Sequence, residues 1–154
     1  MRSGTWAVLC VAIATAGCGG INENVDNTVA SVVPVRGEAT VGETRAAITA
    51  RVSASESVST SPGGLARLRL DQGPELLLDT ETSVTLHDGE SLTLSRGRVF
   101  LEIQPNEQVL LSTENGSLRA SDASFSAVLA DGATHVYVVR GDVSWTVGET
   151  RGIA

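Results

Sequence analysis

Beyond residue 30 the chain alternates between apolar and polar residues, and glycine-containing turns separate the segments. Alternation with a period of two is typical of strands with one buried face, and no segment there has the 3.6-residue period of an amphipathic helix. In Leu65–Leu70 this alternation puts Arg67 and Arg69 on the face opposite the apolar side chains. Further strands are predicted at Leu76–Leu78, Val84–Leu86, Leu92–Leu94, Val99–Ile103, Val109–Leu111, Phe125–Leu129, Val136–Val139 and Val143–Val147. The pattern therefore predicts a single all-β domain of about nine to twelve short strands.

The turn glycines recur at a nearly fixed distance. Gly73 and Gly116 are 43 positions apart, and Gly97 and Gly141, each preceded by Arg, are 44 apart. The hexapeptide Thr-Val-Gly-Glu-Thr-Arg occurs at residues 40–45 and again at 146–151. Internal repeats of this kind fit stacked solenoid coils or two similar half-sheets that face each other. We expect a β-solenoid-like or rolled sheet, with a sandwich as the alternative, and we expect the last strand to close against the first.

The N-terminal residues have the order of a secretory signal peptide. Arg2 is followed by an apolar run over residues 6–16 and then by small residues. The run is about a dozen residues long, whereas a membrane-spanning helix needs roughly 20. Thr15–Cys18 is similar to a bacterial lipobox, and Ala14–Ala16 fits cleavage by the ordinary signal peptidase. Lipidation is the favoured interpretation, and cleavage after Ala16 is the alternative.

These signals predict three regions: a signal peptide with its helix over 1–17, a flexible tether over 18–31 and an all-β domain over 32–154. The tether is polar and rich in glycine and asparagine at its start, as a flexible link requires. The only other cysteine, Cys10, lies in the removed segment, so the mature chain forms no internal disulfide. We predict that Cys18 carries a lipid, which makes the protein a periplasmic lipoprotein of the outer membrane rather than the inner.

The charge of the chain narrows its partners. The formal net charge is −7, and all 11 basic residues are arginines. Nucleic acids and anionic membrane surfaces attract clustered positive charge, so the chain has the wrong sign for either. Aromatic residues make up only 3%, which disfavours a platform for stacking sugars or bases.

Short motifs over most of the predicted domain carry a resemblance to a known family. They are Gly37–Ala39, Val58–Thr60, Ala66–Leu70, Asp71–Gly73, Leu76–Leu78, Leu92–Phe100 and Val136–Val143. In this order the run from Val35 to Val147 resembles the FecR-type periplasmic domain. The resemblance implies a noncatalytic β domain used in envelope sensing or protein contact, as in the transmembrane regulators of iron-uptake sigma factors. A cleavable signal stands where those regulators carry a membrane helix, so we expect this chain to act as a periplasmic partner, accessory or scaffold.

Residues for catalysis or for a cofactor are scarce. The two histidines, His87 and His135, fall in a predicted turn and at the start of a predicted strand. A metal site needs three or more converging ligands, and general acid-base chemistry needs a poised group in a pocket. We therefore predict no enzyme activity and no cofactor or metal. The aspartates beside turn glycines are explained by turn chemistry, although a weak Ca²⁺ site stays open as an alternative.

The predicted partner surface consists of arginines. Arg67, Arg69, Arg96 and Arg98 cluster in the middle of an otherwise acidic chain. They either balance nearby carboxylates or meet an acidic envelope protein or polymer. Protein interaction or signal sensing is the favoured function, and a cell-wall glycan-binding or structural module is the alternative.

Overall fold

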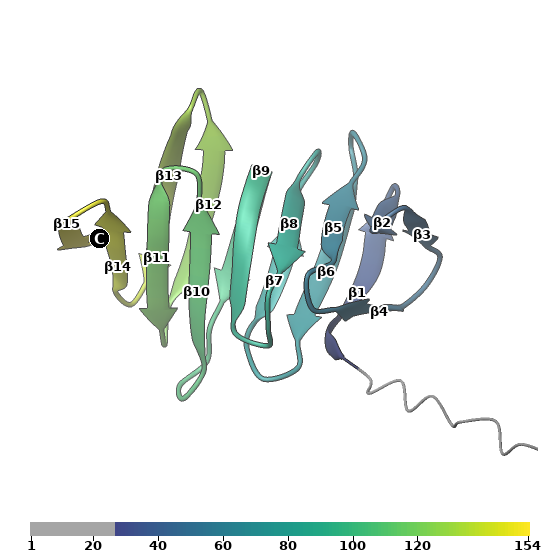
Figure 1. Ribbon diagram of the computed structural model, residues 1–154, viewed down its shortest axis with the longest axis horizontal. Coiled ribbons are helices and arrows are strands. Elements are labelled where there is room, and N and C mark those ends of the chain that lie inside the picture. Colours follow the sequence, from purple (N-terminus) through teal and green to yellow (C-terminus); the bar gives the residue numbers. More distant parts are fainter. Residues whose placement is uncertain (1–26) are drawn as a thin grey trace, which may run out of the picture.

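The computed structural model describes residues 27–154, and these residues form fifteen β-strands and no helix (Figure 1). This confirms the all-β expectation, whereas the predicted signal helix lies outside the described residues. The strands are β1 (Thr28–Arg36), β2 (Ala39–Val41), β3 (Thr44–Ala46), β4 (Ala50–Ser53), β5 (Ser57–Thr60), β6 (Leu65–Leu70), β7 (Glu75–Leu78), β8 (Ser83–Leu86), β9 (Ser91–Glu102), β10 (Gln108–Thr113), β11 (Gly116–Ser121), β12 (Ser124–Ala130), β13 (Ala133–Arg140), β14 (Val143–Val147) and β15 (Thr150–Ile153).

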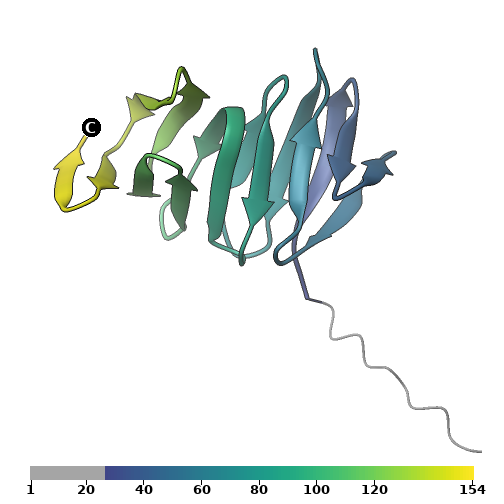
Figure 2. The same cartoon turned by 45° about the horizontal axis from the view of Figure 1, so that its top comes forward.

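Strand pairing links all fifteen strands into one open sheet that folds over into two facing layers (Figures 1 and 2). Strand β9 belongs to both layers, its first half to layer B and its second half to layer A. Layer A runs in the order β4, β1, β6, β7, the second half of β9, β12 and β13. Layer B runs in the order β3, β2, β5, β8, first half of β9, β10, β11, β14 and β15. Both layers advance along the molecule in nearly the order of the sequence. The fold is therefore a solenoid-like β-roll, as expected.

The core lies between the two layers and is built almost entirely from aliphatic side chains. In β6 every second residue is buried, so Ala66, Leu68 and Leu70 point inward while Arg67 and Arg69 point to solvent. The same alternation holds in β7, β8 and β10. Phe125 of β12 is the largest fully buried side chain among the described residues. Burial of apolar area contributes roughly 25 cal/mol per Å² to the free energy of folding. The buried side chains between the layers are therefore the main stabilising feature of the fold.

The sequence repeat of about 43 residues places equivalent hairpins in opposite layers of the roll. The β6–β7 hairpin of layer A is matched by the β10–β11 hairpin of layer B, and the β8–β9 hairpin of layer B by the β12–β13 hairpin of layer A. At Gly97 the chain crosses from layer B to layer A, and at Gly141 it crosses back. Both glycines have positive φ, +87° and +75°, which a side chain would disfavour. One unit of the repeat is thus half a turn of the roll.

Two expectations differ from the structure in the middle and at the start of the roll. The strands predicted at 92–94 and 99–103 are one strand, β9, because the positive φ of Gly97 bends the strand between layers without a turn. The strand β1 begins at Thr28, before the predicted start of the domain at 32, and its Ala30 is fully buried.

The expectation that the last strand closes against the first is wrong. The two copies of the hexapeptide form the β2–β3 and β14–β15 hairpins, which lie at opposite ends of the roll (Figures 1 and 2). Their registers match, with Val41 opposite Thr44 in one and Val147 opposite Thr150 in the other. A glycine with φ of +55° opens each two-residue turn, as hairpins of this length require. The repeated sequence encodes a local hairpin, and it does not encode contact between its copies.

Candidate interaction surface

Three of the four predicted arginines lie on the outer face of layer A. Arg67 and Arg69 project from β6, and Arg98 projects from the second half of β9. Arg96 is the last residue of β9 that pairs with β8, just before β9 passes between the layers at the upper rim of the molecule (Figure 1). Strand alternation therefore places the first three together, while the bend at Gly97 turns Arg96 away from them.

Most of these arginines already have partners within the chain. Arg67 Nε lies 2.9 Å from Glu75 Oε1, and Arg98 Nη1 lies 3.7 Å from Asp79 Oδ2. Arg96 donates from Nε to the backbone carbonyl of Glu81 at 3.0 Å. The guanidinium of Arg69 has no ion pair or hydrogen bond to another residue between 27 and 154. Arg69 is thus the cation on this face that is available to a partner.

A hollow of about 400 Å³ lies beside Arg69 on the same face. Its floor includes Leu77 and Phe100, which are half-buried and stand opposite each other on β7 and β9. Its lining also includes Arg67, Glu75, Glu102 and Glu107. The hollow therefore combines an apolar floor with charged walls of both signs, as the apolar core and polar rim of protein interfaces do.

Two aspartates at the lower rim have pKa values below the ordinary value of 3.8. The pKa of Asp88 is lowered by hydrogen bonds from Ser91 and from the backbone of Glu90. The pKa of Asp71 is lowered by its hydrogen bonds with Arg51. Both carboxylates have partners within the chain. Asp88 accepts hydrogen bonds from the backbone of its own turn, and Asp71 forms an ion pair with Arg51.

The histidines lie apart from each other. His87 is in the β8–β9 turn and shares a 2.8 Å hydrogen bond with the hydroxyl of Thr93. His135 is exposed on the outer face of β13. Among residues 27–154 no group of three or more histidines, cysteines or carboxylates is placed to hold a metal ion.

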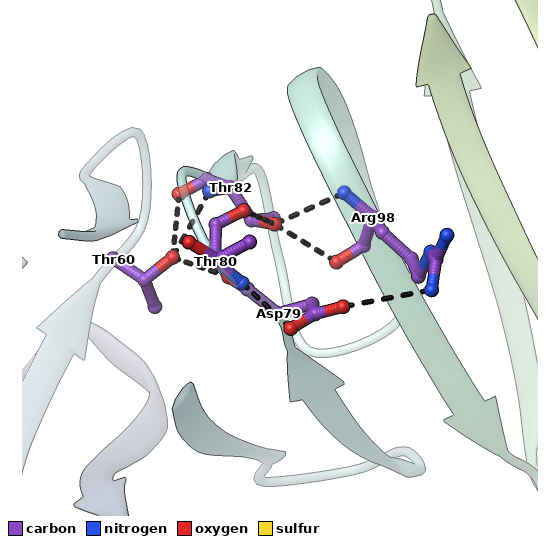
Figure 3. Close-up of polar contacts among 5 residues, drawn as sticks. All are labelled: Thr60, Asp79, Thr80, Thr82 and Arg98. Carbon is purple, nitrogen blue, oxygen red and sulfur yellow. Dashed lines mark hydrogen bonds and ion pairs between the residues drawn. The ribbon is translucent and has the colours of Figure 1, made fainter. Parts of the chain in front are cut away.

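A network of threonines at the upper rim was not predicted from the sequence (Figure 3). Thr60 and Thr82 are buried, and the hydroxyl of Thr60 accepts a hydrogen bond from the N–H of Thr82 at 3.0 Å. Thr60 also donates to the carbonyl of Asp79, and Thr82 bonds the backbone of Arg98. One feature of the sequence could have indicated this network. Thr60 occupies an inward position of a strand, where an aliphatic residue is usual. The network joins β5, the turn after β7, and β9 where the chain changes layers.

The predicted lipidation site Cys18 lies outside the described residues. Within residues 27–154 no helix is both long and apolar enough to cross a membrane.

The two-layer β-roll with its half-turn repeat defines a class of all-β domain, and comparison with known proteins identifies its family. Residues 56–144, from the start of β5 into β14, match the family model described as "FecR protein", so the chain belongs to the FecR family. None of the curated proteins compared with the chain matches it.

Two solved structures share the fold, and both are titled a putative anti-sigma factor from Parabacteroides distasonis ATCC 8503. Their identities to this chain are 17% and 18%, and both have a TM-score of 0.54. Each match covers 64% of this chain and 50% of the solved chain. The chain therefore spans about half the length of these structures, and the likeness extends to the fold.

Proposed function

We propose that this protein is a noncatalytic regulatory module of the cell envelope, which senses or relays a signal through contact with another protein. The observation that carries the proposal is the FecR match over residues 56–144, which takes in most of the roll. The shared fold with a protein titled an anti-sigma factor supports a regulatory role.

The proposed location rests on the N-terminal sequence. A signal peptide over residues 1–17 would export the chain, and a lipid on Cys18 would hold it at the periplasmic face of a membrane, with the outer membrane favoured. A polar tether after Cys18 would let the roll reach a partner that is fixed in the envelope.

The proposed contact surface is the outer face of layer A. Its apolar floor of Leu77 and Phe100 supplies area that a partner can bury, and Arg69 supplies a cation without a partner among the described residues. Such a mixed surface fits an acidic protein partner that places a carboxylate beside Arg69 and an apolar side chain over Phe100. Arg67, Arg96 and Arg98 would contribute less, because each must first give up or share a contact within the chain.

Site-specific crosslinking in living cells tests this surface. A photoreactive residue at position 69 is compared with one at position 119, because Arg119 is also exposed and unpaired among residues 27–154 but lies on the outer face of layer B. We expect position 69 to capture one defined envelope protein that position 119 does not capture. Equal products from both positions, or none from position 69, would contradict the proposal.

Charge reversal gives the second half of the test. Arg69→Glu should weaken crosslinking of the same protein by a photoreactive residue at position 77, in the hollow beside Arg69. Arg119→Glu should leave this crosslinking unchanged. An exposed ion pair contributes about 0.2–1 kcal/mol, so a loss of about two- to fivefold in affinity is expected.

A further inference from the structure

The two ends of the roll differ in how their edges are covered. At the N-terminal end the outermost strands, β3 and β4, have only three and four residues. At the C-terminal end β13 has eight residues and pairs only with β12 among the described strands. From Ala133 to Val139 this edge contains no lysine, arginine, proline or carboxylate, although such residues normally protect an exposed edge. The edge of β13 is therefore open to pairing.

An apolar hollow adjoins this free edge between the layers. Its volume is about 410 Å³, and Leu118, Val136, Trp145 and Val147 are among the residues that line it. Val136 and Trp145 are only half-buried, while Val147 is 51% exposed. On the outer side of the same strand Tyr137 is 61% exposed and Val139 is 74% exposed. Apolar side chains thus stand on both faces of the open edge.

One end of this surface is acidic. Three turns meet at the upper rim there, and each carries one exposed carboxylate: Glu114, Asp131 and Glu149. The first two turns are in contact, because the side-chain amide of Asn115 donates to the carbonyl of Gly132 at 3.0 Å, and Val147, next to the third turn, lines the same hollow as these two residues. None of the ion pairs between described residues includes these three carboxylates. The acidic rim lies at the N-terminal end of β13.

We propose that the β13 edge and its hollow bind an extended segment of a partner protein as an additional antiparallel strand. Main-chain hydrogen bonds to β13 supply affinity, and alternate apolar side chains fill the hollow beside Trp145. An antiparallel segment ends where β13 begins, so its C-terminal residue faces Asp131 and Glu149. The segment therefore alternates apolar residues and ends in lysine or arginine. Strand β12 separates this edge from the hollow beside Arg69, and the proposal does not depend on the function proposed above.

Charge disfavours a second copy of this chain as the occupant. Two-fold pairing of β13 with itself would bring Asp131 of one copy beside the other end of β13 in the second copy. That end carries Asp142 next to Arg140, and Arg140 is already bound to Asp122 at 2.7 Å. Carboxylates would then face carboxylates in a chain whose net charge is −7.

Selection from a displayed library of random nine-residue peptides tests the proposal. The probe is the full chain with Trp6→Phe, so that emission reports Trp145 alone. We expect the selected peptides to alternate apolar residues, to end in lysine or arginine, and to shift the emission of Trp145 to shorter wavelength. Glu149→Lys should weaken these peptides about three- to fivefold. The matched control is Glu43→Lys, because Glu43 holds the same place in the other copy of the hexapeptide and should have no effect.

Four results would overturn the proposal. The first is selected peptides without a basic C-terminal residue, and the second is an equal affinity of the peptides for the Glu149→Lys and Glu43→Lys variants. The third is binding that leaves the emission of Trp145 unchanged. The fourth is a dimer in sedimentation velocity that Tyr137→Lys dissociates, since this would make a second copy the occupant.

Discussion

The hydroxyl of Thr82 bonds both backbone groups of Arg98, accepting from its N–H at 3.0 Å and donating to its carbonyl at 2.9 Å (Figure 3). At this residue β9 has left β8, whose last pair is Ser83 with Arg96, and has not yet joined β7, whose first pair is Leu78 with Val99. On this side of β9 the Thr82 hydroxyl, together with the backbone N–H of Asp79 that donates to the same carbonyl at 3.1 Å, takes the place of a strand partner where the sheet folds from one layer into the other. Thr82 thus ties the bend of β9 to the turn that follows β7.

Replacement of Thr82 by valine should destabilise the fold while keeping its shape. Thr82→Val removes the acceptor for the N–H of Arg98, and a partly buried donor without a partner costs about 1–3 kcal/mol. Urea denaturation measures this loss directly. Thr40→Val is the control, because the hydroxyl of Thr40 forms no hydrogen bond with a described residue and its loss should change the free energy of unfolding by less than about 0.5 kcal/mol. Equal effects of the two variants would refute the role of Thr82.

Replacement of Gly97 by alanine should cost more than replacement of a glycine in an open turn. A Cβ at Gly97 would stand 2.7 Å from the Cα of Thr82, and φ there is +87°. Gly148 also has positive φ, +55°, but a Cβ there would meet nothing within 4 Å. Gly148→Ala should therefore lower the free energy of unfolding only by the cost of the left-handed backbone conformation, about 1–2 kcal/mol. Gly97→Ala adds a clash with backbone, so we expect a markedly lower melting temperature or failure to fold. Similar melting temperatures for both variants would contradict this account.

The comparison of Gly97 with the hexapeptide shows what sequence patterns can predict. Alternation correctly placed Arg67 and Arg69 on one exposed face, because a strand has a fixed period of two. The Arg-Gly pair at Gly97 indicated a turn, yet the same positive φ serves equally well to bend a continuous strand. The identical hexapeptides predicted identical local hairpins, whereas their separation depends on the path of the whole chain.

The candidate surface shows the same limit. Alternation predicted that the arginines of β6 face solvent, but it could not predict that Arg67 pairs with Glu75 of the next strand. That pair depends on the register between β6 and β7, which the turn at 71–74 sets. Arg69 is directly opposite Glu75 in this register, yet the carboxylate reaches Arg67 instead. Side-chain geometry thus decides which arginine stays unpaired, and the pattern of residue types along the chain cannot predict it.

Stability should fall in acid partly because of Asp88. Its pKa in the folded state lies below the ordinary value of 3.8, since hydrogen bonds from Ser91 and Glu90 favour the charged form. This contribution is present above pH 3.8 and is lost as the pH falls through the lower, folded-state pKa. Asp88→Asn keeps an oxygen acceptor but cannot titrate, so its melting temperature should fall less steeply from pH 5 to pH 2 than that of the parent. Asp142→Asn, which removes a carboxylate without a hydrogen bond in the described chain, serves as the control.

The proposed lipid anchor gives the last prediction. Cys18→Ser should abolish incorporation of a labelled fatty acid and should move the protein from the membrane pellet to the soluble fraction, because no other cysteine remains after the signal is removed. Cys10→Ser is the matched control, since Cys10 would be discarded with the signal peptide and its loss should change neither readout. A single acyl chain anchors only weakly, so stable sedimentation of the parent requires more than one chain on Cys18. A Cys18→Ser variant that still sediments after peripheral proteins are extracted would contradict the lipid anchor.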